Sequence, residues 1–266
     1  MKKNFFKVYS RQVKYPIVGV TPAKKTAHKI GKGMAIMVAD ENITVYDEEK
    51  LFALLYLVQN GKAEITVAGK IGNISVVKIT TTMYCIARLL NNYNYPNILK
   101  SLTRIQGMKI IYDVQKTEKG KKIQGKFIIS PIIAIEPYQN GKITLYIEEK
   151  YYNFCLKNFI LLNKEYFEIK GGYAKNISKF LLANRSQKKI SINVVAERCF
   201  FSDQPKKEQR RIIKEALERI NKTSFKKNAT YIVEKDCIVI QKIKKNKKKT
   251  ETQQNQRLPY YTSVTA

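Results

Sequence analysis

Residues 205–221 read PKKEQRRIIKEALERIN and are predicted to form the last helix of a unit that spans residues 171–243. The apolar pattern around this helix predicts the remaining elements of the unit. In chain order, these are a helix from Gly171, a strand at 189–191, a helix at 192–200, a turn at 202–204 and strands at 230–233 and 237–243. Helix, strand, helix, turn, helix and hairpin is the order of a winged helix, a helix-turn-helix followed by a β-hairpin wing.

The two sides of the helix that begins at Pro205 differ in character. At about 100° per residue, one side is an apolar stripe made of Ile213, Ala216, Leu217 and Ile220. The other side carries the basic residues Lys207, Arg210, Arg211 and Lys214. Such a helix can pack with one face and present cations to the major groove of DNA with the other. A solvated surface helix has the same pattern, so the repetition of the unit is needed to favour DNA.

The same order of elements is predicted a second time, nearer the N-terminus. Asp47 is expected to cap a helix that Gly61 ends, residues 80–82 to cap a second helix, and Pro96 to begin a third. The strands predicted around these helices are 64–67, 75–79, 108–114 and 123–130. The residues expected to face outward on the third helix are Asn97, Lys100, Ser101 and Arg104. Asn97 is a candidate to read adenine, and Arg104 and Arg211 are candidates to read guanine in the two halves of a DNA site.

We therefore predict an α+β fold of two tandem winged-helix domains with basic, flexible termini. The predicted divisions are a basic N-terminal arm at 1–33, an N-terminal winged-helix domain at 34–135, connecting elements with a C-terminal winged-helix domain at 136–245, and a disordered tail at 246–266. Within the connection we expect strands at 132–135, 143–147 and 165–169 and a helix at 151–162. Each domain is expected to have its own core, so proteolysis is expected to cut between about residues 131 and 170 or in the tails.

The charge of the chain narrows the class of partner. Lys and Arg number 50 against 21 Asp and Glu, a formal net charge of +29 in 266 residues. A charge of this size opposes compaction unless a polyanion neutralises it. Double-stranded DNA is the leading candidate, and an anionic membrane surface or RNA is the alternative. The predicted recognition helices and the absence of an aromatic-rich nucleic-acid signature argue against this alternative, so no membrane partner is expected.

Enzymatic signatures are missing from the sequence. His28 is the only histidine, the four cysteines are far apart, and no phosphate-binding loop of the Walker type occurs. Adjacent acids such as Glu148 and Glu149 point to opposite faces of a strand and do not make a two-metal site. We therefore expect a protein that is not an enzyme and has no metal and no cofactor. Without a secretory signal or an apolar run of membrane-spanning length, it is expected to be cytoplasmic.

Three segments also resemble a known family. They are 166–169 (YFEI), 173–181 (YAKNISKFL) and the basic helix at 206–221 with its hairpin. Together with the N-terminal copy, they resemble the bacterial plasmid replication initiators of the two-winged-helix Rep type, over roughly residues 40–245. The chain before Asp47 and the stretch after the first wing do not match that pattern.

The resemblance implies a function that the residues alone do not. Members of this family bind repeated origin sequences called iterons, help to open the DNA and recruit the host helicase. The resemblance also implies a monomer–dimer equilibrium, with the dimer contacts in the N-terminal unit. The alternative is a winged-helix transcriptional regulator or repressor, which uses the same DNA contacts without a replication role. Tandem units and the lack of a ligand-binding domain favour the initiator.

Overall fold

A computed structural model describes residues 5–9, 12, 16, 18–30, 33–118, 121–136, 138–223 and 229–242. The predicted tail at 246–266 lies outside the described residues. The helices are α2 (Val45–Gln59), α3 (Met83–Leu90), α4 (Tyr95–Gln106), α5 (Glu149–Lys157), η1 (Lys164–Glu168), α6 (Gly172–Ala183), α7 (Ile192–Arg198) and α8 (Lys206–Lys222). The first strands are β1 (Phe5–Tyr9), β2 (Ala23–Ile30), β3 (Gly33–Ile43), β4 (Glu64–Ile71), β5 (Ile74–Thr82), β6 (Lys109–Glu118) and β7 (Lys121–Ile129). The remaining strands are β8 (Ala134–Ile135), β9 (Lys142–Glu148), β10 (Phe159–Asn163), β11 (Lys189–Ser191), β12 (Ala229–Glu234) and β13 (Cys237–Lys242).

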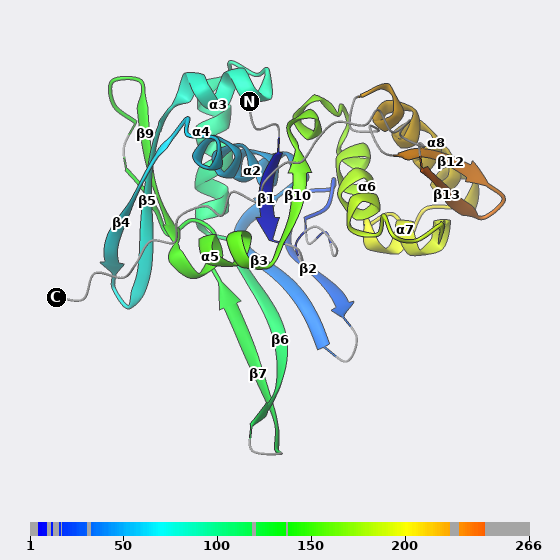
Figure 1. The fold of residues 1–266 in the computed structure, drawn as a ribbon, viewed down its shortest axis with the longest axis horizontal. Helices are drawn as coiled ribbons and strands as arrows, with labels where there is room; N and C mark the ends of the chain where they lie inside the picture. Colours follow the sequence, from blue (N-terminus) through cyan, green and yellow to red (C-terminus); the bar gives the residue numbers. More distant parts are fainter. Residues whose placement is uncertain are drawn as a thin grey trace, which may run out of the picture.

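Helix α2 lies at the centre of the N-terminal part, and two antiparallel sheets accompany it (Figure 1). One sheet has the strand order β2-β3-β6-β7, and the other has the order β4-β5-β9-β8. Every residue of α2 from Asp47 to Val58 is buried, because α3, α4, β1 and α6 contact it. The long β6–β7 hairpin extends away from this body (Figure 1). In chain order this part contains α2, β4, β5, α3, α4, β6 and β7, so both strands expected after the first helix are present and pair as a hairpin.

The expectation of a flexible N-terminal arm is wrong for the described part of residues 1–33. Strand β1 pairs antiparallel with β10, so residues 5–9 lie beside residues 159–163. Phe6 and Val8 of β1 are buried, and the Phe6 ring stacks on Phe167 with centroids 5.6 Å apart. Strand β2 pairs with β3 at the edge of the β2-β3-β6-β7 sheet. The alternation of apolar residues on β1 explains why Phe6 and Val8 are buried. This pattern is short and lies among many lysines, so it was not predicted from the sequence.

The C-terminal part has the predicted order α6, β11, α7, α8, β12 and β13. Strand β11 pairs with β13, which pairs with β12, and α8 packs against α6 and β12. Asp236 lies in the tight turn between β12 and β13, where Lys235 has a positive φ of 50°. In Figure 1 this part lies to one side of the molecule, with α6 facing the N-terminal part.

The connection between the two parts differs from the prediction. Residues 149–157 form α5 but residues 159–163 form β10, so the expected helix at 151–162 is wrong in its second half. Residues 164–168 form a 3-10 helix, where we expected a strand at 165–169. Strand β9 pairs with β5 across its whole length, so residues 142–148 complete a sheet of the N-terminal part. The buried apolar residues of both parts form one continuous cluster, which contradicts the expectation of two separate cores.

Candidate nucleic-acid interface

Helix α8 presents the basic face that the sequence predicts. Ile213, Ala216, Leu217 and Ile220 are buried against α6 and the sheet. The side chains of Lys207, Arg210, Arg211 and Lys214 are exposed. Pro205 is the N-cap residue, one position before the place expected for it, and Lys206 begins the helix.

Gln209 fixes the turn in front of α8. Its side chain is buried, and Nε2 donates hydrogen bonds to the carbonyl oxygens of Ser202, at 3.1 Å, and Gln204, at 2.7 Å. The turn between α7 and α8 is therefore held by a side chain of α8 itself. In the sequence, the only indication of this role is that Gln209 is a polar residue on the apolar side of the helix.

Arg210 and Arg211 of α8 have acidic partners within the protein, whereas Lys207 and Lys214 on the same face have none among the described residues. Arg211 pairs with Glu208, at 2.6 Å, and with Glu215. Arg210 pairs with Asp236 in the turn of the β12–β13 hairpin, at 2.6 Å. Hydrogen bonds from these arginines hold the pKa of Glu208 and the pKa of Asp236 below their usual values. Lys207 and Lys214 are the uncompensated cations of this face.

Arg211 lies on the side of α8 that faces the start of α6. It lines a hollow of about 220 Å³ together with Glu208, Glu215, Arg219 and Gly171. Gly171 has a φ of 92°, a conformation that favours glycine. Arg211 therefore lies at the flank of the basic face, next to this hollow.

Helix α4 presents a narrower polar face than predicted. Asn97 and Lys100 are exposed, as expected, and Thr103 continues the same stripe. Asn94 caps the helix, because its side chain accepts a hydrogen bond from the backbone N–H of Asn97 at 3.1 Å. Pro96 lies in the first turn, where its missing N–H costs nothing.

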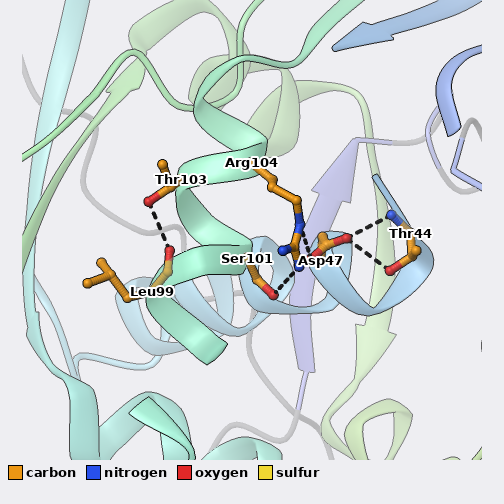
Figure 2. Close-up of polar contacts among 6 residues, drawn as sticks. All are labelled: Thr44, Asp47, Leu99, Ser101, Thr103 and Arg104. Atoms are coloured by element: carbon orange, nitrogen blue, oxygen red, sulfur yellow. Dashed lines mark hydrogen bonds and ion pairs between the residues drawn. The ribbon is translucent and has the colours of Figure 1, made fainter. Parts of the chain in front are cut away.

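Ser101 and Arg104 do not face outward, and that part of the prediction is wrong. Ser101 is buried, and the Arg104 guanidinium donates hydrogen bonds to Asp47 Oδ1 of α2 and to Ser101 Oγ, the latter at 3.1 Å (Figure 2). The Arg104 side chain is 19% exposed and that of Asp47 is 2% exposed. An arginine that pairs with a buried carboxylate has little freedom to reach a DNA base. If it moved away, the carboxylate would remain buried without a cation.

Asp47 is also placed differently from the prediction. Helix α2 begins at Val45, and Thr44 is its N-cap residue, so Asp47 is the third residue of the helix. Asp47 Oδ2 accepts hydrogen bonds from the backbone N–H of Thr44, at 2.8 Å, and from its hydroxyl, at 2.9 Å (Figure 2). The bond to the N-cap backbone is the one that the third residue makes in a capping box, and it leaves Oδ1 for Arg104.

An exposed aromatic pair lies beside α4, which the sequence did not single out. Tyr84 of α3 and Tyr93 of the turn after α3 have ring centroids 6.4 Å apart. Their exposed fractions are 51% and 57%. The sequence could have indicated that Tyr84 is exposed, because this residue falls on the polar side of α3 in the 3.6-residue pattern.

The described residues contain no group of three or more His, Cys, Asp or Glu side chains arranged to hold a metal ion. Among those same residues, no helix is both long enough and apolar enough to cross a membrane. The candidate site is a surface of cations and amides on α4 and α8, each preceded by a shorter helix and followed by a hairpin.

Comparisons with known proteins support this arrangement of elements. No protein-family model and no curated protein matches the chain. A crystal structure of a selenomethionine derivative of domains 2 and 3 of RctB is similar, with a TM-score of 0.61 and 11% identity, over 88% of this chain and 98% of that one. A second structure of RctB domains 2–3 has a TM-score of 0.59 and 13% identity, over 88% and 97%. At this identity the likeness establishes a shared fold.

Proposed function

We propose that this protein binds double-stranded DNA through two winged-helix units and initiates replication of a plasmid by binding repeats at its origin. In this proposal it recruits host replication machinery and acts by binding, not by catalysis. Helix α4 with the β6–β7 hairpin forms one DNA-binding unit. Helix α8 with the β12–β13 hairpin forms the other.

The observation that carries the proposal is the repetition of one cationic arrangement in a single chain. In each unit, the second helix of the proposed helix-turn-helix has an exposed polar face. This face carries Lys100 in the first unit and Lys207 and Lys214 in the second. Each of these helices is followed directly by a hairpin. The net charge of +29 supports a polyanionic partner, and the fold shared with RctB domains 2–3 supports a common architecture. The resemblance to Rep-type initiators supplies the origin as the target.

The first experiment measures how DNA affinity depends on salt. If lysines and arginines of two helices and two hairpins make on the order of 8 phosphate contacts, log K should fall against log salt with a slope of about −7. A slope near zero on duplex DNA contradicts DNA binding as a whole. A steep slope with no preference for any sequence contradicts the proposal of an origin-specific protein.

The second experiment separates an initiator from a regulator. A plasmid without its own origin receives the gene and its flanking DNA, and its maintenance in a bacterial host is scored. Maintenance that is lost when Lys207 and Lys214 are both changed to Ala supports the initiator. Specific binding to the flanking DNA without maintenance supports the alternative, a winged-helix regulator.

A further inference from the structure

Three consecutive acids at the start of α2 each bind a cation from another helix. Asp47 pairs with Arg104 of α4. Glu49 pairs with Lys175 of α6, at 2.5 Å, and Glu48 pairs with Lys179 of α6. One turn of α2 therefore holds the candidate DNA-binding helix of the first unit and the first helix of the second unit. We call the contact between α2 and α6 the seam, and we call Glu48, Glu49, Lys175 and Lys179 the seam charges.

The seam charges are removed from water. The side chains of Glu48 and Lys179 are both 0% exposed, and those of Glu49 and Lys175 are 9% and 5% exposed. The second oxygen of Glu48 accepts a hydrogen bond from Gln12 at 2.7 Å, and Tyr151 donates to Gln12 in turn. The network thus reaches from α6 to α5 through α2.

Residues 18–20 of the N-terminal segment fill the same seam. The backbone N–H of Val45, which begins α2, donates to the carbonyl of Gly19 at 2.8 Å. The Asn176 side chain of α6 donates to the carbonyl of Val18 at 2.9 Å. Gly172 allows the closest approach, since a Cβ there would lie 2.9 Å from a methyl group of Val20.

Buried ion pairs are a poor way to stabilise a contact, because desolvation offsets their attraction and apolar side chains of the same size often hold as well. Burial in fact lowers the pKa of Lys175, against the opposing effect of Glu49. In some proteins such pairs are retained because they fix the register of the contact. An apolar surface can slide by a fraction of a turn, whereas a buried charge has one position in which its partner is met.

We propose that the seam charges position the two candidate DNA-binding helices at one fixed separation, so that the protein accepts only one spacing between the two halves of its DNA site. The connection runs from α4 through Arg104 and Asp47 to α2, across the seam to α6, and through the α6–α8 contact to α8. This inference rests on the proposed function for its DNA part only. The fixed separation itself is a property of the protein alone.

The main test variant removes the seam charges in balanced pairs, as Glu48→Gln, Glu49→Gln, Lys175→Met and Lys179→Met in one chain. Two negative and two positive charges are lost, so the net charge stays at +29. The control variant is Lys78→Met with Glu136→Gln, a balanced ion pair of 3.5 Å that is partly exposed on the sheet away from the seam. A milder variant, Glu49→Gln with Lys175→Met, removes the outer pair only.

The first measurement is a distance between α4 and α8 without DNA. Spin labels are placed at Lys100→Cys and Lys214→Cys after the half-buried Cys85 and Cys237 have been changed to Ser. We expect one narrow distance distribution for the parent and control proteins, and a broadened or split distribution for the seam variant. An equally narrow distribution in the seam variant overturns the positioning role.

The second measurement uses the DNA site preferred by the parent protein, with one base pair inserted between its halves. An insertion shifts the halves by about 3.4 Å and one tenth of a turn. We expect the parent and control to lose affinity by about tenfold or more, the loss typical of broken base contacts, and the seam variant to lose less than about threefold. An unchanged penalty in the seam variant overturns the inference.

The two measurements distinguish the inference from the proposed function. If the parent protein has no preferred DNA site, the proposed function fails, and the distance measurement still decides the positioning role. If the main seam variant does not fold by circular dichroism, the milder variant takes its place. If neither folds, the charges act in stability and the positioning role is overturned.

Discussion

Arg104 is a residue whose single ion pair with Asp47 decides its role. Removing the side chain leaves the Asp47 carboxylate, 2% exposed, without its cation. We expect Arg104→Ala to lower the free energy of unfolding by about 3 kcal/mol, at the low end for a buried pair because Arg104 keeps some contact with water. Urea denaturation followed by circular dichroism measures this change.

Lys100→Ala on the same helix is the matched control for Arg104→Ala. Lys100 is exposed, so its removal should change stability by less than about 0.5 kcal/mol. It should instead weaken DNA binding on all sequences, as expected of a phosphate contact. If Arg104→Ala leaves stability unchanged and alters base preference, Arg104 reads DNA after all.

Cys199 is a residue whose reactivity follows from its burial. Burial raises the pKa of its thiol to about 12, against an ordinary value of 9.0. Only the thiolate is alkylated, so at pH 8.5 iodoacetamide should modify the half-buried Cys85 and Cys237 and spare Cys199 until the chain unfolds. Mass spectrometry of native and denatured samples checks this. Modification of Cys199 in the native protein at the same rate as Cys237 contradicts it.

The raised pKa of Cys199 also makes the free energy of unfolding depend on pH. Between pH 9 and pH 12 the unfolded chain releases the Cys199 proton while the folded chain keeps it. The folded state then binds more protons, so this group lowers the free energy of unfolding as the pH rises through that window. Cys199→Ala should reduce this dependence in pH-resolved denaturation curves.

At the scale of elements, α8 carries the clearest functional prediction. Lys214 is exposed and has no acidic partner among the described residues, whereas Arg211 must first leave Glu208 and Glu215. Exposed ion pairs hold weakly, with about 0–1 kcal/mol each, but two of them still oppose release. We expect Lys214→Ala to reduce the salt slope by about 1 and to cost more affinity than Arg211→Ala. The opposite order of affinities contradicts this account of the basic face.

The elements themselves were largely accessible from the sequence, because they rest on local signals. The Thr82 cap of α3, the Asn94 turn before α4 and the apolar stripe of α8 each depend on residues within a few positions of one another. Helix α6 shows the limit of this reasoning. Its apolar residues Ile177 and Leu181 are buried, but Lys175 and Lys179 are buried as well. No periodicity marks a lysine as buried, because its partner lies more than 120 positions away in the chain.

At the scale of the whole molecule, the relation between the two parts is what the sequence did not provide. Strand β1 pairs with β10, residues 18–20 lie in the seam, and β9 lies between β5 and β8 in the sheet that begins with β4. These are pairings between distant segments, and their strength depends on surfaces that local patterns do not describe. The basic face of α8 could be predicted because it depends only on residues within one helix. It was half wrong on α4, where Ser101 and Arg104 turn toward α2.

The continuous core makes a prediction about unfolding. Leu217 of α8 is 3% exposed, and α8 packs on α6, which meets α2 at the seam. Leu217→Ala removes core packing and should lower the free energy of unfolding by about 2–5 kcal/mol. Because α6 belongs to both packing surfaces, we expect one calorimetric transition that shifts as a whole, where two separate cores would give two.

Ile105→Ala in α4 provides the matched change in the N-terminal part, since Ile105 is fully buried there. It should shift the same single transition as Leu217→Ala. Hydrogen exchange gives the site-resolved test. In Leu217→Ala, the slowest amides of α2 should lose protection by the same free energy as those of α8, because they open together. If the α2 amides keep their full protection while those of α8 lose it, the seam does not couple the two parts, and the N-terminal part is an independent folding unit.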